Sequence, residues 1–166
     1  MTPRLRRAAR PLLVGISLLA LTGCANPFLC CRAGPTAAAA ISQVQPARSG
    51  TARVWFLRQF EPSESLASPM ISANGTPVAL SEPGTAFIRD FAPGTYTFTV
   101  PSYGVDFGQA ATVQLVAGTQ TYLEVQSLRS WAACGDTCER DTLYVRAIPA
   151  YWAQKYFPAL TYLGQG

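Results

Sequence analysis

From Thr51 onward the chain consists of short runs rich in β-branched and aromatic residues, separated at close intervals by glycine and proline. Runs of this kind, bounded by turn residues, are typical of β-strands. The links between them are too short for the long crossovers that join parallel strands, so antiparallel pairing is expected. From these runs about seven strands are expected, the candidate ranges being 52–60, 70–73, 78–80, 85–91, 95–100, 111–116, 122–128 and 142–148, eight in all.

Three dipeptides mark turns between these runs. Asn74 and Gly75 form the strongest hairpin signal, because both residues tolerate a positive φ. Pro83-Gly84 and Pro93-Gly94 mark two further turns. Neighbouring strands are therefore expected to follow one another through tight connections.

The run 95–100 indicates which of its side chains face the core. Tyr96, Phe98 and Val100 alternate with threonines, so one face of this strand is apolar and the other polar. When two sheets pack against each other, the apolar faces of their strands are buried between them. The sequence therefore predicts an all-β fold, a single antiparallel two-sheet sandwich over residues 51–149.

The N-terminal part of the chain has the three features of a secretory signal. Four arginines precede a short apolar run over residues 11–21. The run is followed by the small residues Thr22 and Gly23 and then by Cys24. The run is too short for a spanning helix, which needs about 20 apolar residues. The segment Leu21-Thr22-Gly23-Cys24 resembles the lipobox of bacterial lipoproteins. The alternative is an ordinary cleaved signal without a lipid.

The lipobox resemblance implies an address. Residues 1–23 would be a removed signal peptide, and Cys24 would be the lipidation site, carrying acyl chains such as palmitate. Several acyl chains on one residue suffice for stable anchoring, at about 0.8 kcal/mol for each buried methylene. Neither Ala25 nor Asn26 is the aspartate that retains lipoproteins in the inner membrane under the best-known sorting rule. The resemblance thus implies a lipoprotein of the outer membrane that faces the periplasm.

The apparent basicity of the chain belongs to this signal. The sequence has 13 basic and nine acidic residues, and four of the basic ones are arginines before residue 11. The mature chain is therefore formally neutral, and no later stretch clusters lysine or arginine. Nucleic acid is not expected as a partner.

Cysteine usage fits an oxidising compartment. Besides Cys24, the chain contains Cys30, Cys31, Cys134 and Cys138, which allow three disulfide pairings. A local disulfide between Cys134 and Cys138 is expected, because the glycine between them permits a tight turn. A metal site is the less favoured alternative, since the sequence contains no histidine. The pairing of Cys30 and Cys31 stays open.

The sequence offers few groups for catalysis. Without histidine it lacks the usual general base, and Lys155 is its only lysine. Most carboxylates fall in predicted turns, where solvated charges are the common case. We therefore expect no catalytic residues, no metal and no cofactor, and a protein that is not an enzyme.

Two segments flank the predicted domain. Residues 24–50 contain the lipidated cysteine and three prolines that interrupt helices, and they are expected to form a flexible tether. Residues 150–166 form an aromatic tail in which a short helix is expected. Such a tail either packs over an open edge or end of the sandwich or offers Tyr151 and Trp152 to a partner. Trp131 lies in a long connection between two predicted strands, a common position for binding residues.

Several segments carry a resemblance to known families. Residues 91–100 (FAPGTYTFTV) resemble the turn-and-strand motif of prealbumin-like (transthyretin-like) sandwiches, including carboxypeptidase-regulatory and PEGA-type modules. The segments ARVWF (52–56), NGTPV (74–78) and PGTAF (83–87), in that order, resemble an uncharacterised family of bacterial envelope lipoproteins with a domain of unknown function. The resemblance implies a prealbumin-like fold and an envelope address, and it carries no functional residues.

Together these observations predict a non-enzymatic, lipid-anchored periplasmic protein that presents a β-sandwich to another envelope component. The alternative is a module that binds a small ligand or a glycan. In that case Trp131, Tyr151 and Trp152 are the expected binding residues, because exposed aromatic rings offer stacking surfaces.

Overall fold

The computed structural model describes residues 34–61, 66–102, 107–131 and 139–165. All described residues belong to one compact unit. Within these ranges, no helix is both long enough and apolar enough to cross a membrane. Cys24, predicted to be lipidated, and Cys134 and Cys138, predicted to form a disulfide, lie outside the described residues.

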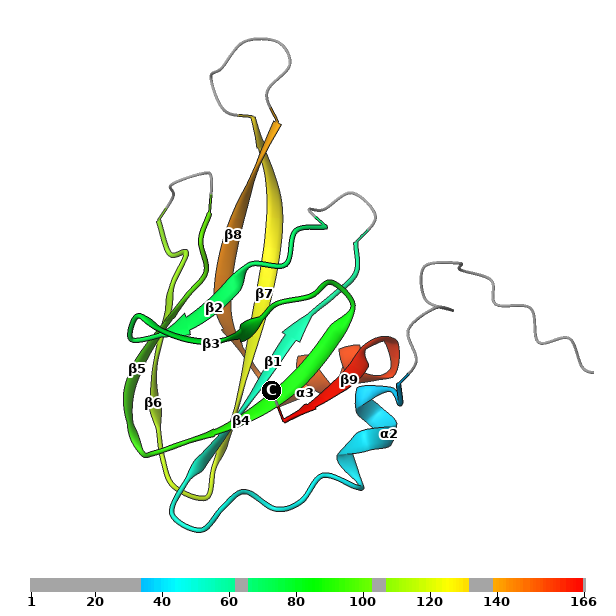
Figure 1. Cartoon of the computed structure of the whole chain (residues 1–166), viewed down its shortest axis with the longest axis vertical. Helices are drawn as coiled ribbons and strands as arrows, with labels where there is room; N and C mark the ends of the chain where they lie inside the picture. Colours follow the sequence, from blue (N-terminus) through cyan, green and yellow to red (C-terminus); the bar gives the residue numbers. More distant parts are fainter. Residues whose placement is uncertain (1–33, 62–65, 103–106, 132–138, 166) are drawn as a thin grey trace, which may run out of the picture. The chain divides into compact units, whose positions relative to one another are not determined.

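This unit is built mainly from strands (Figure 1). Its elements, in chain order, are α2 (Ala37–Ile41), β1 (Ala52–Arg58), β2 (Met70–Ala73), β3 (Thr76–Leu80), β4 (Thr85–Phe91), β5 (Gly94–Thr99), β6 (Ala111–Leu115), β7 (Gln120–Trp131), β8 (Glu139–Ile148), α3 (Ala150–Tyr156), the 3-10 turn η1 (Phe157–Ala159) and β9 (Thr161–Gln165).

The strands form two sheets, which confirms the expected all-β sandwich architecture. One sheet has the order β8-β7-β1-β4-β9 and the other β3-β2-β5-β6. Two details of the prediction are wrong. The described residues form nine strands rather than about seven, and the pairing is not wholly antiparallel, because β1 pairs in parallel with β7 and β4 with β9.

The parallel pairs have a simple physical origin. Between β1 and β7 the chain forms the whole second sheet, and between β4 and β9 it forms the later strands and α3. These excursions take the place of a dedicated crossover helix. The sequence prediction considered only the links between consecutive strands, which are short, and so missed pairings between distant ones.

The hairpin predicted at Asn74 and Gly75 is confirmed. Their φ angles are 49° and 80°, as a tight two-residue hairpin turn requires, and Ala73 pairs with Thr76 across it. The side chain of Asn74 also fixes the turn to β5. Its Oδ1 accepts a hydrogen bond from the Thr97 backbone N–H at 2.8 Å, and its Nδ2 donates to the Thr95 carbonyl at 3.3 Å.

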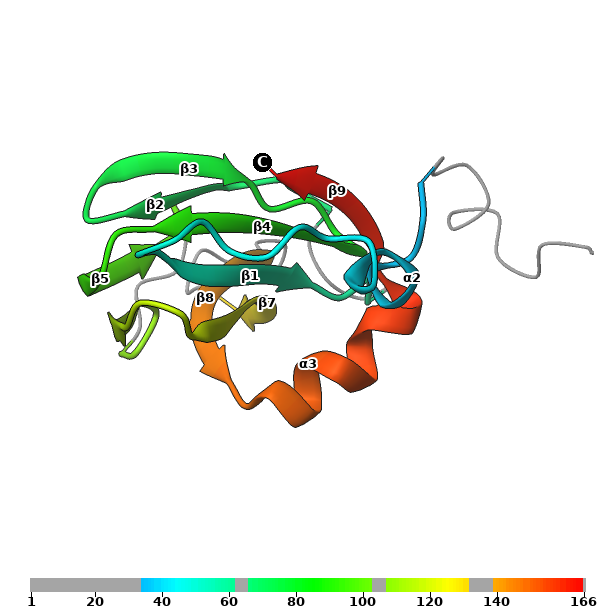
Figure 2. The same cartoon turned by 90° about the horizontal axis from the view of Figure 1, so that it is seen from below.

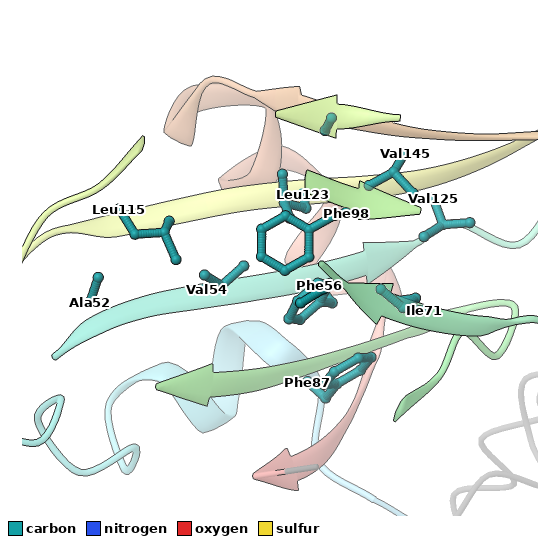
Figure 3. Close-up of a cluster of buried hydrophobic side chains, with 12 residues drawn as sticks. Ala52, Val54, Phe56, Ile71, Phe87, Phe98, Leu115, Leu123, Val125 and Val145 are labelled. Atoms are coloured by element: carbon teal, nitrogen blue, oxygen red, sulfur yellow. The ribbon is translucent and has the colours of Figure 1, made fainter. Parts of the chain in front are cut away.

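A first hydrophobic core lies between the two sheets (Figure 3). Phe56 is at its centre, with ring centroids 4.8 Å from Phe87 and 5.5 Å from Phe98. Phe98 is fully buried, and Tyr96 and Val100 pack against the cluster as partly buried side chains, which confirms the core face predicted for β5. Burial of aromatic rings on this scale is the main source of sandwich stability.

A second hydrophobic core lies on the other face of the five-stranded sheet. It forms around Trp55, whose ring centroid lies 5.0 Å from that of Phe157 and whose Nε1 donates to Gln120 Oε1 at 2.8 Å. Figure 2 shows α2 and α3 on the side opposite to β5 and β6. The five-stranded sheet is therefore covered on both faces, and this explains why all seven residues of β1 are buried.

Residues 34–50 were expected to belong to a flexible tether, but they are bound to the rest of the domain. The Ala37 N–H donates to the Leu160 carbonyl at 2.7 Å, and the Tyr162 N–H donates to the Pro35 carbonyl at 2.9 Å. A short helix forms despite the prolines, because Thr36 caps it through a 3.1 Å bond from the Ala39 N–H. Its alanines at 37 and 40 are buried, and such small side chains allow close packing.

The C-terminal tail contains the expected short helix, α3, but continues beyond it. After η1 the chain forms β9, which pairs in parallel with β4 and so lies at the edge of the five-stranded sheet. Residues 34–50 and 150–165 thus belong to the same folded unit as the predicted sandwich, because their buried side chains complete the second core.

Candidate functional site

An open cleft lies where the β2–β3 hairpin faces the end of β4. Its volume is about 550 Å³, and we call it the inter-sheet cleft. β9 pairs with β4 only as far as Ile88, so residues 89–91 have no strand partner on that side among the described residues. The cleft is lined by Ala73, Asn74, Thr76, Pro77, Val78, Arg89, Asp90, Phe91 and Tyr96.

Arg89 is the cationic group of the inter-sheet cleft. It is half-buried, and its Nη2 donates one hydrogen bond, 3.1 Å long, to the Val78 carbonyl. No carboxylate pairs with it within the part of the chain that the structure describes. A guanidinium has five N–H donors in a planar fork, so most of its hydrogen-bonding capacity is left for an anionic group.

Aromatic rings form the apolar part of the cleft. The centroids of Phe91 and Tyr96 lie 5.2 Å apart in an edge-to-face arrangement, and Phe91 lies 5.6 Å from Phe98 of the core. The rings are therefore held by the inter-sheet core rather than free to reorient. A guanidinium beside fixed aromatic rings suits a ligand group that combines a carboxylate with an apolar or planar part.

Asp90 does not neutralise Arg89, because it points to the other face of the sheet and pairs with Arg53. The Arg53 side chain donates from Nε to Asp90 Oδ1 at 2.8 Å and from Nη2 to Oδ2 at 3.0 Å. The two side chains are only 5% and 7% exposed. This bidentate pair is structural, since Arg53 also donates to the Gln45 carbonyl and the Arg48 N–H donates to Asp90 Oδ2 at 3.2 Å.

The environment of Asp90 favours its charged form. The hydrogen bond from the Arg53 side chain lowers the pKa of Asp90 below its ordinary value, burial acts in the opposite direction, and the Arg48 backbone N–H lowers the pKa further. Asp90 is therefore ionised at neutral pH and binds residues 45–48 to the sheet. It is not poised for proton transfer.

The aromatic residues predicted for binding do not form one site. Tyr151 and Trp152 lie on α3, 60% and 45% exposed, and neither lines the inter-sheet cleft. Trp131 is the last residue of β7 and pairs with Glu139, at the opposite end of β8 from α3. At about 3.4 Å per residue, the ten residues of β8 place the two ends some 30 Å apart. The side chain of Trp131 lies outside the described residues.

Tyr151 and Trp152 form an exposed cluster with Lys155, which we call the α3 face. Their ring centroids lie 5.4 Å apart, and Lys155 Nζ lies 4.5 Å from the centroid of Tyr151 and 4.8 Å from that of Trp152. These are cation–π distances. The α3 face lies on an exposed helix, and none of its three residues lines the inter-sheet cleft.

The sequence prediction missed Arg89. Its signal is present in the chain, because β4 reads TAFIRDF and so places two adjacent opposite charges inside an apolar strand. Successive side chains of a strand point to opposite faces, so these charges cannot neutralise each other there. Among the described residues, no group of three histidine, cysteine, aspartate or glutamate side chains is arranged to hold a metal ion.

The described residues thus form a two-sheet β-sandwich with a helical layer on one sheet and a cleft, lined in part by Arg89, at the sheet edges. A scan against protein-family models finds no match to the chain, and a search of curated proteins finds none either.

Proposed function

We propose that this chain is a non-enzymatic, lipid-anchored envelope protein that binds a partner protein in its inter-sheet cleft. The lipobox-like segment ending at Cys24 supports an anchor in the outer membrane, facing the periplasm. The two sheets support a prealbumin-like sandwich, as does the 91–100 motif, which connects β4 of one sheet to β5 of the other.

The observation that carries partner binding is the half-buried Arg89 without a carboxylate partner in the described residues. The cleft is open and lies between the edge strand β3 and the unpaired end of β4. An open cleft beside strand edges suits an extended protein segment, which adds backbone hydrogen bonds to its side-chain contacts. The partner segment is expected to be extended and to place an aspartate or glutamate on Arg89.

A small-ligand function is the second candidate, and the same cleft supports it. Phe91 and Tyr96 beside Arg89 would suit a small carboxylate with an apolar part, and the volume lies within the range of ligand sites. The open form favours the protein segment, because small-ligand sites enclose most of the ligand surface. Tyr151 and Trp152 are exposed, as stacking on a glycan would need, but neither lines the cleft, so they give the glycan alternative less support than the cleft gives a protein segment.

A photo-crosslinker at Thr76, an exposed residue of the cleft, tests this proposal in intact cells. We expect a discrete protein adduct that weakens about tenfold or more in an Arg89→Gln background, since a charged hydrogen bond contributes about 1.5–3 kcal/mol. A crosslinker at Thr112, exposed on β6, serves as the matched control. An adduct of equal yield with Arg89→Gln would contradict the proposal, and a bound small carboxylate without any protein adduct would favour the second candidate.

A further inference from the structure

The α3 face is exposed, and its two aromatic rings present apolar surface to water. α3 directs Ala153 into the second core, while Tyr151, Trp152 and Lys155 face outward. The exposed rings are ordered by each other and by the Lys155 ammonium group. Tryptophan and tyrosine are the residues enriched at the interface between membrane and water. A lysine beside them can extend its ammonium group to the lipid phosphates.

The position of the proposed anchor limits how far this surface can be from a membrane. The described chain begins at Gly34, and its next residue, Pro35, is hydrogen-bonded to Tyr162 of β9. Nine residues lie between Cys24 and Gly34, which makes ten steps along the chain. Whatever their path, ten steps span at most about 36 Å. With a lipid anchor at Cys24, the point where the chain enters the domain, at Pro35 beside β9, would lie within about 36 Å of the lipid surface.

The charge of this side matches an anionic lipid surface. Residues 34–50 and 149–165 contain no aspartate or glutamate, and their only charged side chains are those of Arg48 and Lys155. Both segments cover the same face of the five-stranded sheet, where α2 contacts η1 and the second core (Figure 2). Basic residues near a membrane are attracted to anionic headgroups, whereas carboxylates would be repelled.

We propose that the α3 face docks on the headgroup layer of the membrane that holds the lipid anchor. This inference rests on the proposed anchoring at Cys24. Docking turns the helical layer toward the lipid and the four-stranded sheet, on the opposite side of the sandwich, toward the periplasm. A lipid anchor then acts with a second, weaker contact, whose effective concentration the short connection keeps high.

Tryptophan quenching tests the proposal with the full-length processed protein, purified from membranes and reconstituted into vesicles of phosphatidylethanolamine and phosphatidylglycerol in equal amounts. The vesicles contain either ordinary or brominated acyl chains, and bromine quenches only nearby tryptophans. The contribution of Trp152 is the difference between the wild type and Trp152→Phe. We expect this contribution to fall by about half or more in brominated vesicles, as for an interfacial tryptophan. Lys155→Gln should reduce the quenching most in vesicles rich in phosphatidylglycerol.

The matched control places a tryptophan on the opposite side of the sandwich. Thr112→Trp in the Trp152→Phe background puts the same residue type on the exposed face of β6, and we expect it to remain unquenched. Equal quenching of the two positions, or none at Trp152 in protein that floats with the vesicles, would overturn the docking alone. Protein that fails to float with vesicles would overturn the anchor and the docking together. If Trp152 were shielded from quenching only when another protein is crosslinked to the α3 face, that face would be assigned to a protein partner and the lipid assignment would be overturned.

Discussion

Replacing Phe157 by alanine should lower the free energy of unfolding by about 3–5 kcal/mol, as is typical for a buried phenylalanine. Phe157 is 2% exposed, and its ring fills the space against Trp55 at 5.0 Å and Tyr122 at 6.2 Å between ring centroids. Its removal leaves a cavity between the five-stranded sheet and the helical layer. Urea denaturation followed by circular dichroism measures the change, and the melting temperature should fall by roughly 10 °C.

Leu163→Ala is the matched control for this prediction. Leu163 lies in the same C-terminal segment but is 44% exposed, so its loss should change the stability by no more than about 0.5 kcal/mol. If Phe157→Ala were as mild as Leu163→Ala, the helical layer would not belong to the cooperative unit. The boundary of the stable domain would then lie near Pro149, as the sequence suggested.

Asp90→Ala should destabilise the protein by about 3 kcal/mol, because it leaves the guanidinium of Arg53 buried without its carboxylate. The pair is bidentate, and both side chains are almost fully covered. The variant should also release residues 45–48, which are bound through Arg53 and Asp90. Faster amide hydrogen exchange in this segment, measured by mass spectrometry, would accompany the lower stability.

The double variant Arg53→Met/Asp90→Leu distinguishes two energies: the cost of leaving one charge buried alone, and the net contribution of the ion pair to stability. Replacement of both charges by apolar side chains should recover most of the stability, because neither charge is then left buried alone. If the double variant were as unstable as Asp90→Ala, the loss of the contacts with Gln45 and Arg48 would account for the destabilisation, rather than the unpaired charge of Arg53.

The lowered pKa of Asp90 also predicts a pH dependence. The Arg53 hydrogen bond lowers the folded-state pKa below the unfolded value of about 4. Ionised Asp90 therefore contributes its full stabilisation above that value, and the contribution is lost as the pH falls through the lower folded-state pKa. The difference in unfolding free energy between the wild type and Asp90→Asn should therefore be constant from about pH 5 to about pH 7. It should shrink below about pH 4.

Local signals in the sequence predicted local structure well. Asn74 and Gly75 carry the information for their own turn, since few other residues adopt two successive positive φ angles. The alternation of threonines with Tyr96 and Phe98 likewise identifies the buried face of β5. In both cases the residues that determine the structure are close together in the chain.

Features that depend on distant pairing were not predictable in the same way. The parallel pairing of β1 with β7 joins residues more than 60 positions apart, as Arg53 and Gln120 show. Residues 34–50 look like a tether because their own side chains are small or polar, and their fixed position comes from Leu160, Asp90 and Tyr162 instead. Arg89 becomes notable only once the fold separates it from Asp90.

Lipid anchoring at Cys24 can be tested by measuring the mass of the N-terminal peptide of the protein isolated from membranes. We expect a chain that begins at Cys24 and carries acyl chains on that residue, with Cys24→Ser lacking any acylated peptide. Cys30 should not substitute, because the bulky Leu29 precedes it. An unmodified Cys24 in the membrane-bound protein, or acylation that persists in Cys24→Ser, would contradict the anchor and the orientation derived from it.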